Sequence, residues 1–313
     1  MTAPHVVTLG ETMGALSTTG ATPLMRGDAL TLSIAGSESN VAIGLSRLGT
    51  RATWIGCVGD DGVGRMIVRE LRAEAVVTRT RVVADRSTGL LTKEREATDR
   101  WRVTYNRTES AGAAIGPGDV ADLGDATHLH VTGITMAIGP SGLAAVRAAV
   151  AAARANGLTI SLDVNHRSRL WGEEEARTAL RSVLAQIDIV FASLDETHLL
   201  TDRRGSIEEV ASDIAAAGPT EVVLTMGAGG SLTFGAGRST VHPAESVDLV
   251  DPVGAGDGFV AGYLHARLGG SSMTAAAVLG NRVGAHIVAH PGDWESAPRA
   301  AQLTTTPGDN VAR

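Results

Sequence analysis

DPVGAGDGFVAGYL, residues 251–264, is the most informative stretch of this 313-residue chain. Gly254, Ala255 and Gly256 precede Asp257, and an apolar run follows. The pattern predicts a glycine-rich turn that opens a helix, with Asp257 at the position of a capping carboxylate. The free N–H groups and the dipole of a helix start attract an anion such as phosphate. A carboxylate beside that phosphate could accept a proton from an attacking hydroxyl, although a plain loop and helix cap would use the same residues.

Composition limits the class of protein that this chain can be. Apolar residues make up 43% and charged residues 19%, which predicts a substantial core. The net charge of −7 argues against a general nucleic-acid or anionic-membrane binder. The single cysteine, Cys57, allows no intrachain disulfide and fits a reducing compartment. No apolar run of about 18 residues and no signal-like N-terminus occur, so we expect a cytoplasmic protein without a membrane span.

Strand-like and helix-like segments alternate along the chain. We expect buried strands at 5–10 and 52–59, a strand running into a turn at 128–138, and a strand followed by polar residues at 158–171. A strand and then a helix are expected at 187–201, a strand, glycine turn and strand at 221–234, and helices at 141–156 and 271–290. This alternation, without an internal repeat or a clear linker, predicts an α/β fold with a doubly wound, mainly parallel sheet in one domain, residues 1–313.

Two further stretches stand out from this alternation. Gly36 precedes a helix that ends at Gly49, with Asn40 in its first turn and Ser37 or Ser39 as its expected cap; an ordinary capped helix would look the same. Residues 86–108 are polar and strand-like, which suits a sheet with one face in water.

The glycine stretches resemble the two signatures of the PfkB (ribokinase-like) carbohydrate kinases, G-G-x-x-x-N-x-A-x-x-L-x-x-L-G and D-T-x-G-A-G-D-x-F. Ser37 stands at the second glycine of the first signature, and Pro252 and Val253 replace the usual threonines of the second. The resemblance runs from Gly10 to about Asp293. It implies a ribokinase-like fold with a small β-sheet lid formed by residues 12–36 and 86–110. It also implies ATP and Mg²⁺ as cofactors, Asp257 as catalytic base, and Gly254, Ala255 and Gly256 as the anion hole.

Within this family, GSESN, Tyr105-x-Arg107, HVTGIT and DVNHRSRLW resemble the 2-keto-3-deoxygluconate kinases. The resemblance implies that Arg107 binds a substrate carboxylate, which a guanidinium can do through two parallel hydrogen bonds. An edge-strand surface arginine is the alternative. Leu91 stands where the family often has an aromatic residue, so one substrate contact is expected to be missing or replaced.

The resemblance assigns further residues to the two ligands. The sugar acid is expected to contact Gly36, Ser37, Asn40, Tyr105, Arg107, Arg167, Asp257 and Asp293. The nucleotide is expected to contact Asn165, Arg167, Ser193, Thr225, Gly227, Gly229, Gly230, Gly254, Gly256 and Asn281. Glu196 is expected to hold Mg²⁺ through water, unless it is a solvated glutamate at a helix start. Met226 lies beside the position where the family often has a lysine, so that contact with the nucleotide is expected to be absent. The resemblance also allows a monovalent cation as a further cofactor. Lid sheets often pair between subunits in this family, which would give a dimer.

Other functions stay open at this point. A fructokinase or ribokinase of the same family would not need Arg107 for a carboxylate. A sugar- or nucleotide-binding relative without catalysis would keep the same fold. A dinucleotide-binding oxidoreductase is disfavoured, because no G-x-G-x-x-G follows the first strand with an acidic residue about 20 positions on.

Overall fold

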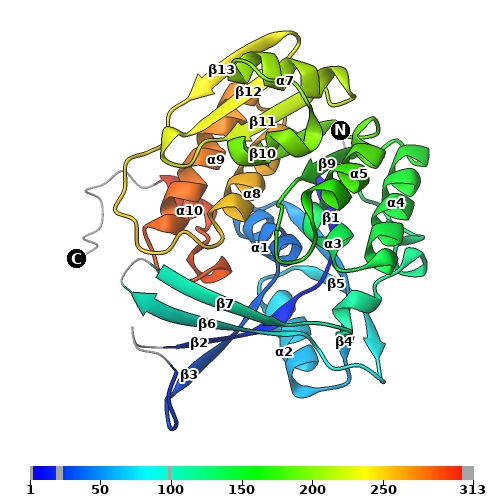
Figure 1. The fold of residues 1–313 in the computed structure, drawn as a ribbon, viewed down its shortest axis with the longest axis vertical. Coiled ribbons are helices and arrows are strands. Elements are labelled where there is room, and N and C mark those ends of the chain that lie inside the picture. Colours follow the sequence, from blue (N-terminus) through cyan, green and yellow to red (C-terminus); the bar gives the residue numbers. More distant parts are fainter. Residues whose placement is uncertain (1–2, 19–23, 98–99, 305–313) are drawn as a thin grey trace.

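The computed structural model describes residues 3–18, 24–97 and 100–304. Within these residues the chain forms one large sheet between two layers of helices and a separate, smaller sheet (Figure 1). The predicted α/β fold with a mainly parallel sheet and a small extra sheet is therefore confirmed. No helix in the described part of the chain has the length and apolar character needed to cross a membrane.

The large sheet has nine strands among the described residues. In spatial order these are β13 (Arg238–His242), β12 (Ser231–Gly235), β11 (Glu221–Thr225), β10 (Ile189–Ser193), β9 (Thr159–Asp163), β8 (His128–Thr132), β1 (His5–Leu9), β4 (Arg51–Gly59) and β5 (Val77–Val83). The strands from β11 to β5 are parallel, whereas β12 and β13 are antiparallel. From β1 the chain builds outward to β4 and β5, and from β8 it builds in the other direction. Such a reversal of strand order opens a crevice at the carboxyl ends of the strands, where α/β sheets bind ligands.

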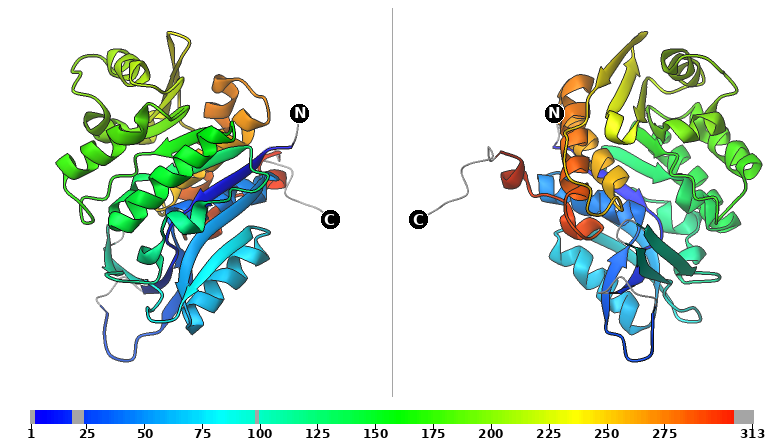
Figure 2. Two further views of the ribbon diagram at one scale, coloured as in Figure 1. Left: turned by 90° about the vertical axis from the view of Figure 1, so that its right-hand side faces the viewer. Right: turned by 60° about the vertical axis from the view of Figure 1, so that its left-hand side comes forward.

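Helices cover both faces because the strand residues that point to each face are apolar. Val7 and Leu9 of β1 belong to one core, while Val6 belongs to the other. The first core packs under α3 (Gly133–Ala137), α4 (Pro140–Ala155), α5 (Glu173–Leu184), α6 (Thr197–Leu200) and α7 (Ile207–Ala216). The second packs under α1 (Ser37–Leu48), α2 (Gly62–Ala73), α8 (Ala255–Leu268) and α9 (Met273–Val288), and α10 (Ala300–Thr304) follows. Figure 2 shows the green helices on one side of the sheet and the orange helices on the other.

The small sheet lies beyond the carboxyl ends of the large one (Figure 1). Its strands, in spatial order, are β3 (Leu30–Ala35), β2 (Met13–Thr18), β6 (Leu90–Ala97) and β7 (Arg100–Asn106). Met13, Ala15, Ala35 and Leu91 form an apolar cluster on one face of this sheet. The sheet therefore has one packed face and one face toward water, as the polar character of residues 86–108 predicts.

Several boundaries differ from the sequence-based prediction. Residues 86–108, predicted only as strand-like, contain two antiparallel strands, β6 and β7. The expected turn after β8 is the short helix α3, capped by the Thr132 hydroxyl, which accepts hydrogen bonds from two N–H groups. Strands β5 and β13 were not predicted. Both lie at sheet edges with mostly exposed residues, so they lack the apolar run that marks a buried strand.

Candidate active site

The glycine turn before α8 brings its backbone close to an acidic residue. Gly254 adopts a left-handed conformation (φ +80°), and a Cβ atom there would lie 2.5 Å from Asp293 Oδ1, so only glycine fits. A Cβ at Gly256 would meet nothing within 4 Å, which leaves space for a ligand at the helix start. Asp257 is not the predicted cap. It lies inside the first turn of α8, and Gly254 holds the cap position without a side-chain hydrogen bond.

The start of α1 faces this turn. Gly36 precedes the helix, and a Cβ there would lie 2.5 Å from Glu11 O. The predicted caps are also wrong, because neither Ser37 nor Ser39 caps the helix. The Ser39 hydroxyl donates to Gly36 O, and the Ser37 hydroxyl donates to Asp257. The Ser37 hydroxyl, which a local rule would assign as the cap of α1, therefore binds Asp257 of α8 instead.

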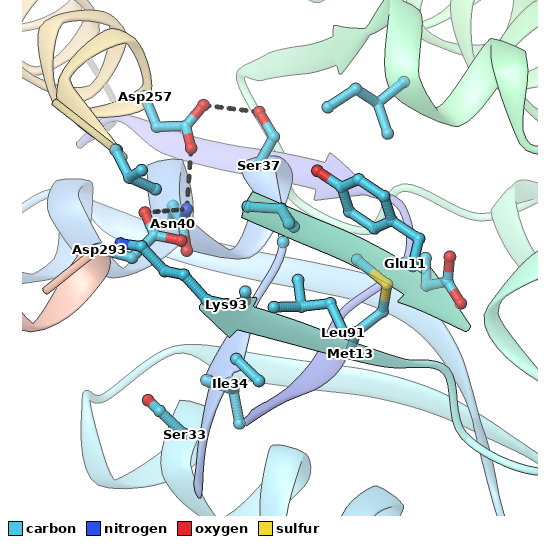
Figure 3. A pocket seen from close by; sticks show the side chains of 18 of the residues that line it. Glu11, Met13, Ser33, Ile34, Ser37, Asn40, Leu91, Lys93, Asp257 and Asp293 are labelled. Carbon is cyan, nitrogen blue, oxygen red and sulfur yellow. Dashed lines mark hydrogen bonds between the residues drawn. The ribbon is translucent and has the colours of Figure 1, made fainter. Parts of the chain in front are cut away.

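Ser37 and Asn40 of α1 hold Asp257 through hydrogen bonds (Figure 3). Its Oδ1 accepts from Ser37 Oγ at 2.6 Å, and its Oδ2 accepts from Asn40 Nδ2 at 2.8 Å. Asn40 Nδ2 also donates to Asp293 Oδ1 at 2.9 Å, and Asn165 Nδ2 donates to Ser37 Oγ at 2.9 Å. Within the described part of the chain, the hydrogen bonds to the Asp257 carboxylate come from the neutral side chains of Ser37 and Asn40.

Burial raises the pKa of Asp257, against the lowering effects of Ser37, Asn40 and the Arg167 charge. Burial also raises the pKa of Asp293 to about 7, helped by the negative charges of Asp257 and Glu295. A carboxylate whose pKa lies above its usual range is a better proton acceptor near neutral pH. The electrostatics therefore suit a general base at this helix start.

Two cavities meet at Asp257. The smaller, of about 180 Å³, lies between the large sheet and the inner face of the small sheet. The larger, of about 510 Å³, lies at the carboxyl ends of β9, β10 and β11. Both are lined by Val103, Tyr105, Arg167, Val253, Gly254 and Asp257. A ligand in each cavity would thus reach the same carboxylate and the same helix start.

The end of the smaller cavity remote from Asp257 carries an ion pair. Arg107 Nη2 lies 2.5 Å from Glu11 Oε2, and the Glu11 side chain is fully buried. Ser110 Oγ donates to the other Glu11 oxygen at 2.5 Å. The Arg107 guanidinium also lies 5.9 Å from the centre of the Tyr105 ring. Its Nε is buried and without a hydrogen-bond partner in the described part of the chain, so this end keeps a cationic donor for a ligand.

The larger cavity is lined by seven of the residues predicted for the nucleotide and its metal: Asn165, Arg167, Ser193, Glu196, Thr225, Gly254 and Gly256. Both oxygens of Glu196 accept backbone N–H groups, from His166 and from Ser193, at 2.7 Å each. Burial and the nearby Glu196 carboxylate raise the pKa of Asp163 well above its usual range. Both acids line this cavity. Within the described ranges, however, no cluster of three or more His, Cys, Asp or Glu residues could enclose a metal ion.

The remaining predicted nucleotide residues lie outside the lining of these cavities. Gly227, Gly229 and Gly230 form a single 3-10 turn and its end after β11. Asn281 is buried, and its amide donates to the carbonyl oxygens of His242 and Pro243 at 3.1 Å. Their contact with a nucleotide stays a prediction.

Among the polar residues of the site that were not predicted are Glu11, Lys93 and Asp251. Lys93 Nζ lies 2.6 Å from Asp251 Oδ2, and both side chains are nearly buried. No local sequence pattern predicts the Glu11–Arg107 pair or the Lys93–Asp251 pair. One compositional signal does exist, since Lys93 is the only lysine among the 27 lysine and arginine residues of the chain.

Comparisons with known proteins agree with this geometry. The profile of the pfkB family carbohydrate kinases matches residues 3–300. The chain is 34% identical to the 2-dehydro-3-deoxygluconokinase of Bacillus subtilis, over 96% of this chain and 94% of that one. It is 31% identical to the 2-dehydro-3-deoxygalactonokinase of Haloferax volcanii, with 88% of each chain covered. The crystal structure of fructokinase from Vibrio cholerae with fructose, ADP and calcium superposes with a TM-score of 0.83 at 26% identity, covering 96% of this chain and 97% of that one.

Proposed function

This chain belongs to the pfkB family of carbohydrate kinases, and on that premise we propose that it phosphorylates 2-keto-3-deoxygluconate with ATP. The product would be 2-keto-3-deoxy-6-phosphogluconate. The observation that carries the proposal is the meeting of two cavities at Asp257, one beneath the small sheet and one at the strand ends. The sugar acid would occupy the first and ATP the second.

The proposed step forms one bond and breaks another. The substrate hydroxyl oxygen attacks the γ-phosphorus of ATP, the bond from that phosphorus to the bridging oxygen breaks, and ADP leaves. Asp257 takes the hydroxyl proton, with Ser37 and Asn40 holding its two oxygens. The N–H groups at the α8 start, at Gly254, Ala255 and Gly256, receive the charge of the phosphoryl oxygens, and Arg167 adds positive charge.

The residues at the larger cavity fit a magnesium ion. Asp163 and Glu196 provide two neighbouring carboxylates, and Mg²⁺ takes few carboxylates while it keeps several waters. Because both Glu196 oxygens already accept N–H groups, Glu196 would act through water. The bound ion offsets negative charge on the ATP phosphates. A further monovalent cation stays a prediction, to be checked by assaying with and without KCl.

The substrate choice rests on the remote end of the smaller cavity. Arg107 is anchored by Glu11 through one nitrogen and keeps a buried Nε without a partner. A carboxylate would satisfy this donor, whereas fructose and ribose carry none. Leu91, which stands where related kinases often have an aromatic residue, lines the same cavity.

The test is ATP consumption with Mg²⁺ against 2-keto-3-deoxygluconate, 2-keto-3-deoxygalactonate, fructose, ribose and gluconate. We expect a preference for a keto-deoxy acid. A preference for fructose or ribose would keep the kinase and reject the carboxylate argument. No turnover of any sugar, together with tight ATP binding by titration, would support a binding protein without catalysis.

We also propose that the chain forms a homodimer through the small sheet. The outer face of β3 exposes Leu30 and Leu32, at 37% and 47% of their accessible surface. Light scattering after size exclusion would give a mass near twice 32.1 kDa. A monomer mass at micromolar concentration would reject the dimer.

A further inference from the structure

The chain uses arginine at 26 of its 27 lysine and arginine positions, and the single exception is Lys93. Lys93 lies on β6 of the small sheet and lines the smaller cavity. Its side chain is 12% exposed, and its ammonium nitrogen lies 2.6 Å from Asp251 Oδ2. Figure 3 shows it beside Asp293, at the end of the cavity where Asp257 lies. The only lysine of the chain therefore lies in the lining of the cavity and not on the exposed surface.

Asp251 joins this lysine to the helix start. While its Oδ2 meets Lys93, its Oδ1 accepts the N–H of Val253 at 3.1 Å. The next residue is Gly254, whose left-handed conformation leads directly into α8. One oxygen of Asp251 therefore stabilises the turn from 251 to 254, and the other binds Lys93 of the small sheet.

The charge balance explains why a cation is needed here. The Asp251 side chain is 4% exposed, and a buried carboxylate without a partner is strongly unfavourable. Asp257 and Asp293 lie close by, and the proposed phosphoryl group adds more negative charge. An ammonium is a compact point charge, whereas a guanidinium is a planar fork that needs more space. Lysine thus meets a requirement at this position that arginine meets less well.

We propose that Lys93 is a positioning residue for phosphoryl transfer: through Asp251 it holds the 251–254 turn, and thereby the N–H groups at the α8 start, in place. This inference rests on the proposed kinase function. Because Lys93 belongs to the small sheet, this ion pair joins the sheet that would cover the sugar to the turn that would receive the phosphate. Substrate recognition and phosphate recognition are then linked by one ion pair.

The first test compares Lys93→Met with Arg69→Met, which removes a positive charge from the exposed surface of α2. We expect kcat to fall about 100-fold in Lys93→Met, since small misplacements at a reacting centre cost that much, while KM for the sugar changes little. Arg69→Met should match wild type. Ammonium or methylamine should restore part of kcat in Lys93→Ala and leave wild type unchanged. Wild-type kcat in Lys93→Met would overturn the proposal.

A double-mutant cycle with Asp251→Asn tests the route of the effect. Lys93→Met and Asp251→Asn should together cost no more than either alone, because both break one pair. Fully additive losses would show that Lys93 acts elsewhere. Amide hydrogen exchange at Val253 and Gly254 gives a readout without any sugar, and it should be faster in Lys93→Met. Unchanged exchange would contradict the inference even if the substrate assignment failed, so the two failures are distinguishable.

Wild-type protein offers a test that avoids folding problems of variants. Amine-directed acetylation can reach only Lys93 and the N-terminal amine, since the chain has no other lysine. Acetylation removes the charge, whereas reductive methylation keeps it. With the extent of labelling at Lys93 measured by mass spectrometry, we expect acetylated protein to lose activity and methylated protein to keep most of it. Equal activity of the two forms would overturn the role of the charge.

Discussion

The two ends of the smaller cavity are built on different parts of the fold. At one end, Ser37, Asn40 and Asp257 project from α1 and α8, which pack within the same core cluster. At the other end, Tyr105 and Arg107 come from the end of β7 and the residue after it, in the small sheet. The first end is held by helices of the core, and the second by a sheet with only a small apolar cluster of its own. We call the first the frame end and the second the cover end, and we infer that the proposed proton transfer belongs to the frame end and the proposed carboxylate recognition to the cover end.

The largest expected effect comes from the frame end. In Asp257→Asn the amide cannot accept the hydroxyl proton, so kcat should fall by roughly 10²–10⁴-fold. The affinity for ATP, measured by titration calorimetry, should stay close to wild type, since the proposed role of Asp257 is to accept the sugar proton and not to bind ATP. Substantial turnover in this variant would remove Asp257 as the base.

The cover end should respond in KM rather than in kcat. Arg107→Ala removes charge-assisted hydrogen bonds worth about 1.5–3 kcal/mol, so KM for the keto-deoxy acid should rise roughly 10- to 100-fold. Arg107→Lys keeps the charge without the fork and should fall between the two. Steady-state kinetics with the acid and with fructose provide the measurement. If Arg107→Ala kept its affinity for the acid, the contrast between the two ends would be lost.

A pH profile sharpens the comparison from the frame side. Asp293 has a pKa of about 7, and its charged form is the better acceptor for a sugar hydroxyl. The carboxyl is neutral below that pKa and charged above it, so kcat/KM should rise with pH through about 7. The change from pH 6 to 8 should be about tenfold for one ionisation. In Asp293→Asn this rise should disappear, and a profile identical to wild type would assign it to another group.

The smallest effect probes the packing beneath the frame end. A Cβ at Gly44 of α1 would lie 2.7 Å from the Cβ of Ala261 in α8, so the two helices touch without a side chain between them. Gly44→Ala should push them apart and lower kcat a few-fold, because Ser37 and Asp257 sit on these helices. Adding Ala261→Gly should restore kcat in the double variant. If the single variant had normal kcat, the frame would be less rigid than we infer.

The sequence predicted those features that depend on local patterns. The GAGD turn, the glycine before α1 and the alternation of strands and helices all follow from neighbouring residues. Asp257, Asn40 and Asp293 were each assigned to the site, and the structure brings them together. Ser37 was assigned to the sugar and also as a possible cap. The cap is wrong, because a distant carboxylate competes for its hydroxyl. The contact of Ser37 with the sugar stays a prediction.

The pairs that depend on long-range contacts could not be predicted. Lys93 and Asp251 are 158 positions apart, and no periodicity links a polar lid strand to a loop before a helix. Glu11 follows the first strand without any motif that would pair it with Arg107. Edge strands β5 and β13 were not predicted for a related reason, since their exposed residues carry no apolar pattern. Contacts between distant segments arise from the fold, so they become visible only with it.

The six residues shared by the two cavities have a consequence for inhibitor design. Because both cavities reach Asp257, a molecule with a nucleotide joined through phosphates to the terminal oxygen of a keto-deoxy acid could place one half in each. Joining two ligands makes the second binding event intramolecular and raises its effective concentration, to the millimolar range for short linkers. Such a bisubstrate compound would also select for this enzyme over other ATP-binding proteins, because only its sugar-acid half meets Arg107.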